Sequence, residues 1–250
     1  MTIKFKGFLS GNTIKIISAV AMLIDHIGFA FYPYFIGETL MLAMRSIGRI
    51  AMPLFAFMIA EGCRHTKDRK RYFLMIFLLG LVCDIVYYVA MQELYLCILT
   101  TFSFSILLIY SYDGMVKSVK EKNNGFLYHL ICFACVASVL VLANTWATDK
   151  GGYLDYGILG ALLPLLCYLF KNRWLRTLMM ALGVLAMCLS DMLGGFEGFP
   201  YYWFAFVPVI IAALYNGERG KLKLKSFFYL FYPIHLVAIQ GIVILLSLTL

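Results

Sequence analysis

The sequence has few charged residues for its length. Asp, Glu, Lys and Arg make up 14% of the 250 residues, whereas hydrophobic residues make up 63%. A soluble globular protein is excluded, because its surface would have to be filled with polar and charged side chains. The alternation of polar and apolar residues that is typical of a membrane β-barrel is also missing. The chain instead holds apolar runs of about 20 residues, which predict an all-α, polytopic transmembrane helix bundle.

The chain also lacks an internal repeat, and no connection is long enough for a second domain. We therefore expect residues 1–250 to form a single integral-membrane domain. The seven cysteines do not follow a disulfide or zinc pattern. Their one close pair, Cys132-x-x-Cys135, lies inside an apolar run, where packing explains it better than redox chemistry. We expect no bound metal.

Hydropathy and length together predict about nine spanning helices. The expected segments are 13–35, 45–62, 72–91, 95–112, 126–146, 154–170, 174–192, 201–215 and 226–248. The eighth is short, and the links at 92–94 and 171–173 leave the neighbouring boundaries loosely defined.

The positions of lysine and arginine predict the orientation of these segments. With nine spans, 18 of the 21 Lys and Arg residues fall on the same side as the N-terminus. Cytoplasmic loops carry such an excess, so we expect a cytoplasmic N-terminus and an exterior C-terminus. This rule also accounts for most of the net charge of +8, and no nucleic-acid partner is needed.

Asp25 and His26 lie side by side within the first apolar segment. An ionisable group at membrane depth costs about 2.5–3.5 kcal/mol on insertion scales, so each needs a partner or a function. Helix neighbours point about 100° apart, so the two side chains face different partners. Arg49 of the second segment is the expected partner of Asp25, with Arg45 one turn away on the same face. Pro53 predicts a kink that frees the Arg49 carbonyl.

Lys15 lies on nearly the same face of the first helix as His26, about 16 Å away along the axis. A cation at the cytoplasmic boundary below an imidazole suits a long anionic thioester donor, and the alternative explanation of Lys15 is an ordinary positive-inside anchor. A basic loop after the second segment is a further place for the donor's phosphates. Its candidate residues are Arg64, His65, Arg69, Lys70 and Arg71, with a topological signal as the alternative explanation.

Other polar residues are candidates for contact with an acceptor. Arg45, Glu61, Asp84, Asp155 and Tyr232 are the ones we single out, and Asp155 is also explained as a helix N-cap. His235 follows Pro233 in the last segment, which places a second imidazole near mid-membrane. Packing and function are equally good explanations of His235, and the sequence does not decide which histidine is the base.

Several short motifs carry a resemblance to a known family. They are Leu23-x-Asp25-His26-Ile27-Gly28, then Arg45-x-x-Gly48-Arg49-x-Ala51-x-Pro53-x-Phe55-Ala56-Phe57, then Glu61-Gly62 with Thr66 and a basic run to Tyr72, then Asp155-Tyr156-Gly157 and Tyr232-Pro233-x-His235. Over essentially the whole chain, the sequence resembles the TraX family, polytopic membrane enzymes that N-acetylate F-type pilin. The first helix also resembles the acyltransferase 3 families, which have a proposed catalytic histidine and an arginine where this chain has Lys15.

The resemblance implies a membrane-embedded acetyltransferase that uses cytosolic acetyl-CoA. Its acceptor would be an amine or hydroxyl, on a protein N-terminus or on a glycan or lipid of the cell envelope. His26 would be the general base or a transient acyl carrier, with Asp25, Arg49 and His235 as the other catalytic candidates. The alternative is a proton-coupled secondary transporter that uses Asp25, His26, Arg49, Asp84 and His235 as a relay.

Overall fold

The computed structural model describes residues 7–194, 203–222 and 224–248. Within them the regular secondary structure is helical apart from two strands of two residues each, so the expected all-α class is confirmed. Seven helices of these ranges are long and apolar enough to cross a membrane, with Glu38–His65 counted as one. Two others, α7 (Gly157–Leu169) and α10 (Val207–Ala213), are shorter. Each of the nine predicted segments contains helix, and 201–202 of the eighth lie outside the described residues.

The helices form two compact units, which are described separately. The first unit comprises residues 1–58 and 173–250, and the second comprises residues 59–172. The first holds α1 (Gly11–Phe31), α2 (Glu38–Gly48), α8 (Arg173–Leu193), α10 and α11 (Lys225–Ser247). Helix α3 (Ala51–His65) contributes its first eight residues to this unit and the remainder to the second.

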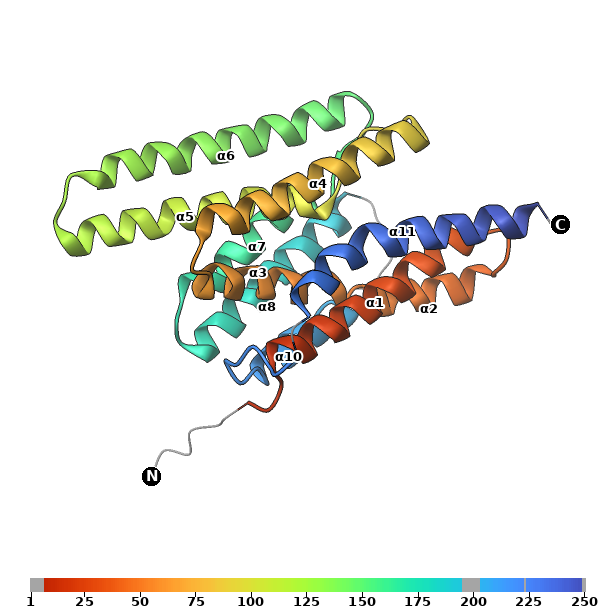
Figure 1. The fold of residues 1–250 in the computed structure, drawn as a ribbon, viewed down its shortest axis with the longest axis horizontal. Helices are drawn as coiled ribbons and strands as arrows, with labels where there is room; N and C mark the ends of the chain where they lie inside the picture. Colours follow the sequence, from red (N-terminus) through yellow and green to blue (C-terminus); the bar gives the residue numbers. More distant parts are fainter. Residues whose placement is uncertain (1–6, 195–202, 223, 249–250) are drawn as a thin grey trace. The chain divides into compact units, whose positions relative to one another are not determined.

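In the first unit, α1 packs against both α2 and α11 (Figure 1), and α10 packs against α8. The first residues of α1 are hydrogen-bonded to the connection that follows α10. Gly11 donates its backbone N–H to the Glu218 carbonyl at 2.8 Å, and the Asn12 side chain donates to the Leu222 carbonyl at 2.7 Å. Arg173, at the start of α8, donates to the Tyr215 carbonyl at 3.0 Å. Segments predicted to be cytoplasmic therefore meet at one end of this unit.

The second predicted segment is longer than expected, and it is broken where Pro53 was expected to free the Arg49 carbonyl. It extends over Glu38–His65, and the helix is interrupted at Arg49 and Ile50. Pro53 lies in the first turn of α3, where a backbone N–H would have no intrahelical partner to lose. Pro53 thus belongs to the start of a new helix. It lies one turn after Arg49, whose carbonyl has no N–H partner there.

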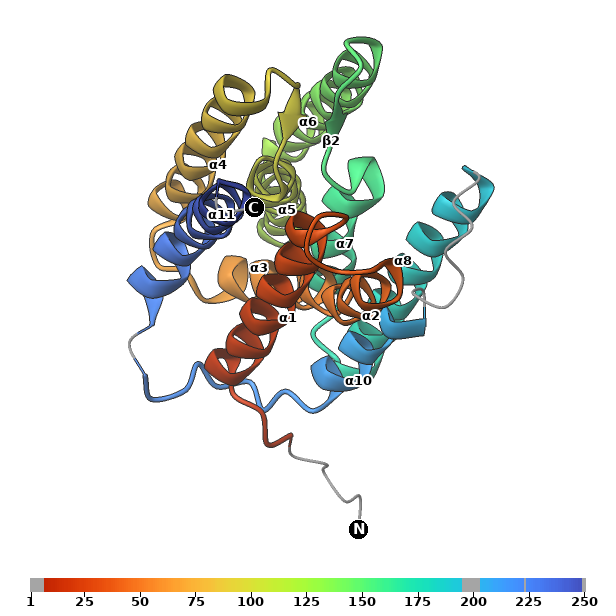
Figure 2. The same ribbon diagram turned by 90° about the vertical axis from the view of Figure 1, so that its right-hand side faces the viewer.

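In the second unit, α5 (Ile98–Glu121) packs against α4 (Arg69–Met91), α6 (Gly125–Asp149) and α7. Figure 2 shows α5 among these three helices. Strands β1 (Tyr95–Leu96) and β2 (Tyr153–Leu154) pair in parallel at the α4–α5 and α6–α7 connections. Two hydroxyl groups of α5 bond to the backbone of the β2–α7 segment, Thr101 to the Asp155 carbonyl at 2.8 Å and Ser105 to the Ala161 carbonyl at 2.7 Å.

Candidate functional site

Asp25 and His26 point to different helices, as the 100° rule predicts. The Asp25 carboxylate accepts a hydrogen bond from Arg45 of α2 at 2.8 Å. The Asp25 and Arg45 side chains are 17% and 29% exposed, so this is a half-buried ion pair. The prediction that Asp25 pairs with Arg49 is therefore wrong about the bonded partner. Arg49 is close enough for its charge to act on Asp25 and on Asp191 of α8.

Two glycines allow α1 and α2 to approach each other closely at this pair. A Cβ on Gly48 would lie 2.0 Å from Oδ1 of Asp25 and 2.4 Å from its Cβ. A Cβ on Gly28, one turn after Asp25, would lie 2.7 Å from the Cβ of Met44. Only glycine, which has no side chain, fits between α1 and α2 at these two positions. This close approach explains why both motifs carry glycine beside the charged residues. Neither glycine was predicted to have a role at the site.

His26 contacts His235 of α11, although 209 residues separate them in the chain. Nδ1 of His26 and Nε2 of His235 are 3.0 Å apart, and the ring centroids are 5.0 Å apart. The other ring nitrogen of His235, Nδ1, lies 2.7 Å from the Phe231 carbonyl oxygen. His235 is only 4% exposed. The two histidines that the sequence offered as alternative bases thus form one dyad.

Aromatic rings enclose His235 on its own helix. The Phe231 ring is stacked on the His235 ring, with an 8° angle between the planes and 4.8 Å between the centroids. The buried Tyr232 presents its ring edge-on to His235 at 5.8 Å. Tyr232, predicted as an acceptor contact, therefore lies against the dyad. Phe231 was not expected at the site, because a phenylalanine in an apolar helix carries no sequence signal.

Lys15 belongs to the same unbroken helix as His26, which keeps the predicted separation of about 16 Å along the axis. Its ammonium lies 5.7 Å from the centre of the Phe228 ring of α11. Lys15 contacts Phe228, and His26, farther along α1, contacts His235, which is farther along α11. The contacts therefore come in the same order along both helices. Helices α1 and α11 are therefore parallel, which agrees with the odd number of spans that the sequence predicts.

The predicted donor-binding arginines belong to the second unit, where two of them have partners in the protein. Arg64 lies 3.3 Å from the Glu61 carboxylate and donates to backbone carbonyls at the end of α7, among them those of Cys167 and Phe170. Arg69 pairs with Asp113 of α5. Arg64 in particular satisfies the carbonyls that the end of a helix leaves without partners. Both side chains thus hold the fold together.

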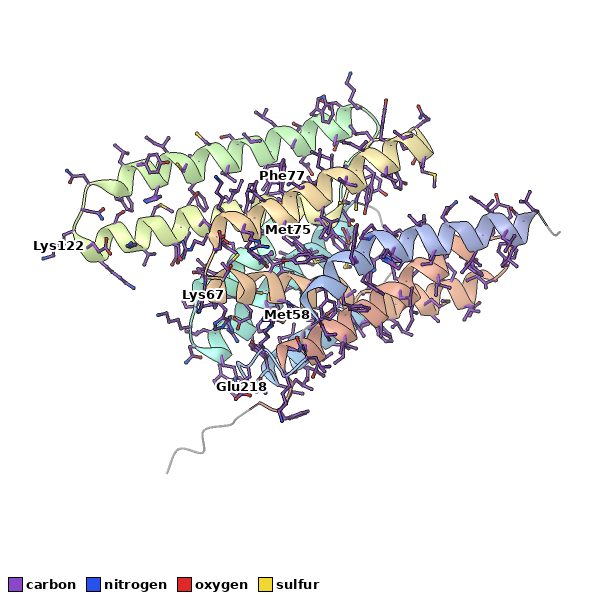
Figure 3. The ribbon with its side chains drawn as sticks, viewed as in Figure 1. Met58, Lys67, Met75, Phe77, Lys122 and Glu218 are labelled. Atoms are coloured by element: carbon purple, nitrogen blue, oxygen red, sulfur yellow. The ribbon has the colours of Figure 1, made fainter. Side chains whose placement is uncertain are left out.

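The remaining members of the basic loop are exposed. His65 lies 3.5 Å from Glu61, which is buried, and its side chain is 66% exposed. Lys70 and Arg71 are exposed in the first turn of α4, and Figure 3 shows Lys67 on the turn between α3 and α4. These members of the basic loop have exposed side chains.

Asp84 and Asp155 form hydrogen bonds near the paired strands β1 and β2 of the second unit. Asp84 accepts hydrogen bonds from the Cys97 backbone N–H at 2.7 Å and from the Thr100 hydroxyl at 2.6 Å, so it caps the start of α5. Asp155 is not the N-cap of α7 that was the alternative explanation, because that position is taken by Tyr156. Its backbone N–H instead donates to the Leu96 carbonyl at 2.8 Å. No three His, Cys, Asp or Glu side chains of the described ranges are grouped to hold a metal ion.

Comparison with known proteins places this arrangement in a family. The TraX protein family model matches residues 10–243. The chain is 22% identical to the probable fimbrial assembly protein FimC, serogroup H1, of Dichelobacter nodosus, over 91% of this chain and 93% of that protein. It is 28% identical to the uncharacterized protein RP591 of Rickettsia prowazekii (strain Madrid E), over 65% of this chain and 56% of that protein. No solved structure matches. The match covers α1 through most of α11 and includes Asp25, Arg45, His26 and His235, so this multi-pass membrane protein belongs to the TraX family.

Proposed function

We propose that the protein is an acetyltransferase of the bacterial cytoplasmic membrane that moves an acetyl group from cytosolic acetyl-CoA to an amine or hydroxyl. The observation that carries the proposal is the contact between His26 and His235 beside the Asp25–Arg45 ion pair. Acyl transfer from a thioester needs a group that removes a proton from the acceptor and donors that stabilise a developing oxyanion. The first unit holds both kinds of group.

His26 is the proposed general base. An imidazole in position contributes about 10²–10⁴ in rate by general acid–base catalysis. Arg45 supplies positive charge near His26, Arg49 supplies it near Asp25, and Asp25 holds Arg45 in place. Their proposed role is to stabilise the tetrahedral oxyanion, for which one well-placed donor contributes about 3–4 kcal/mol.

Lys15 is the proposed contact for the phosphates of acetyl-CoA. It lies in the same unit as His26, at the end where the basic connections of that unit meet. A donor held there by its phosphates would extend its thioester arm along α1 toward the dyad. Lys70, Arg71 and His65 belong to the second unit and stay predictions from the sequence, on which this proposal does not depend. Arg64 and Arg69 are weaker candidates, because they already bind the protein.

The proposed acceptor is a protein N-terminus or an envelope glycan or lipid. The Dichelobacter relative is named a probable fimbrial assembly protein, which favours a protein of a surface fibre as the first acceptor to try. The family resemblance supports an N-terminal amine in particular.

The test is acetyl transfer by the full chain in lipid nanodiscs, with radiolabelled acetyl-CoA and a panel of amine and hydroxyl acceptors. We expect His26→Ala to lower kcat at least about 100-fold, and Lys15→Gln to raise the KM for acetyl-CoA more than it lowers kcat. His129→Ala, which changes a histidine of α6 in the other unit, is the matched control. Proton-coupled flux in proteoliposomes without acetyl-CoA consumption would establish the transporter instead.

A further inference from the structure

The hydrogen bonds of the dyad determine where its protons lie. The Phe231 carbonyl oxygen can only accept, so Nδ1 of His235 must carry the hydrogen of that 2.7 Å contact. In a neutral His235, Nε2 then has no hydrogen and accepts from His26. Nδ1 of His26 must therefore be the donor of the 3.0 Å contact. This leaves the lone pair of a neutral His26 on its other ring nitrogen, Nε2.

We propose that the two histidines have different roles. Nε2 of His26 takes the acceptor's proton. His235 is a positioning residue that sets the His26 tautomer and receives a proton from His26. This inference rests on the proposed acetyltransferase function. It assigns the base to one atom, a choice that the sequence left open between His26 and His235.

The proton balance of the transfer follows from this assignment. The acceptor's nitrogen or oxygen attacks the thioester carbonyl, and its proton passes to Nε2 of His26. The proton on Nδ1 of His26 then moves across the 3.0 Å contact to Nε2 of His235. When the tetrahedral intermediate collapses, the carbon–sulfur bond breaks and the thiolate of CoA leaves. The proton returns through His26 to that thiolate, which restores the dyad without an outside acid or base.

Burial disfavours a positive charge on either ring, so the neighbouring groups decide which histidine holds it. The Arg45 guanidinium acts electrostatically on His26, and its positive charge opposes an imidazolium there. A protonated His235 would instead be stacked on the Phe231 ring at 4.8 Å and would keep its bond to the Phe231 carbonyl. A cation over an aromatic face is stabilised by the ring quadrupole.

The tautomers can be tested without any enzyme assay. Nitrogen-15 NMR of histidine-labelled wild-type protein in nanodiscs, assigned with His26→Gln and His235→Gln, distinguishes protonated from bare ring nitrogens. We expect a hydrogen on Nδ1 of both residues and none on Nε2 of either. A hydrogen on Nε2 of His26, with a doubly protonated resting His235, would overturn the assignment.

The relay is tested by kinetics with His235→Gln and His235→Ala. Glutamine can accept the bond from His26 through its amide oxygen but cannot take up a proton. We expect His235→Gln to lower kcat about 10–100-fold, to leave the KM for acetyl-CoA nearly unchanged and to change the solvent deuterium isotope effect. His129→Gln is the control. Wild-type kcat in His235→Gln would refute the relay, whereas a wild-type protein that transfers no acetyl group, with the tautomers as expected, would refute only the proposed function.

Discussion

The substitution Gly48→Ala tests the contact between α1 and α2 on which the site depends. Gly48 is buried at the last position of α2, and the added Cβ would lie 2.0 Å from Oδ1 of Asp25. Rotating the carboxylate away is not enough, because the Cβ of Asp25 is itself only 2.4 Å from the new atom. Either α1 and α2 move apart, or Asp25 gives up its place beside Arg45.

The magnitude follows from these contacts. Overpacking a well-filled contact typically costs about 1–3 kcal/mol. A hydrogen bond between charged groups contributes about 1.5–3 kcal/mol, and the exposure of Arg45 places the Asp25–Arg45 bond near the lower value. The higher helix propensity of alanine offsets this destabilisation by less than about 1 kcal/mol, because Gly48 is the last helical residue. We expect Gly48→Ala to lower the free energy of unfolding by about 2–4 kcal/mol.

The assay is reversible unfolding in mixed detergent micelles, with acetyl transfer measured on the same samples. Gly241→Ala in α11 is the matched control, since a Cβ there meets no atom within 4 Å. That variant should equal the wild type or gain up to about 1 kcal/mol. Equal stability of the Gly48→Ala and Gly241→Ala proteins would refute the close α1–α2 approach.

Three further predictions concern the ion pair, the second unit and the topology. In a double-mutant cycle, Asp25→Ala and Arg45→Ala should show a coupling energy of about 1–2 kcal/mol, and additive losses would show that the residues do not touch. Asp84→Asn should lower the free energy of unfolding by about 1–3 kcal/mol, because two donors at the start of α5 lose a charged acceptor; unchanged thermal unfolding would contradict this role. A reporter after Leu250 should be exterior, and a reporter within 117–122 should be cytoplasmic. Finding both reporters on one side would require an even number of spans between them.

The amino-acid sequence by itself determined the class of fold and the positions of the helices. A bilayer crossing has a set length and leaves no backbone polar group without a partner, so apolar runs of about 20 residues translate directly into spanning helices. The same local geometry showed that Asp25 and His26 face different partners, because neighbours on a helix differ by about 100°. The break at Arg49 was predictable as well, since Pro53 has no backbone N–H to offer the Arg49 carbonyl.

Only the tertiary structure decided which residues meet. Arg45 and Arg49 lie on one face of the second segment, and the choice between them as the partner of Asp25 depends on how far α2 is shifted along α1. Periodicity carries no information about that shift, which is set by the close contacts at Gly28 and Gly48. The contact of His26 with His235 joins residues 209 positions apart, and the Phe231 carbonyl that orients it belongs to the backbone. Such contacts arise when helices pack, and packing depends on side-chain shapes across the whole unit rather than on any one segment.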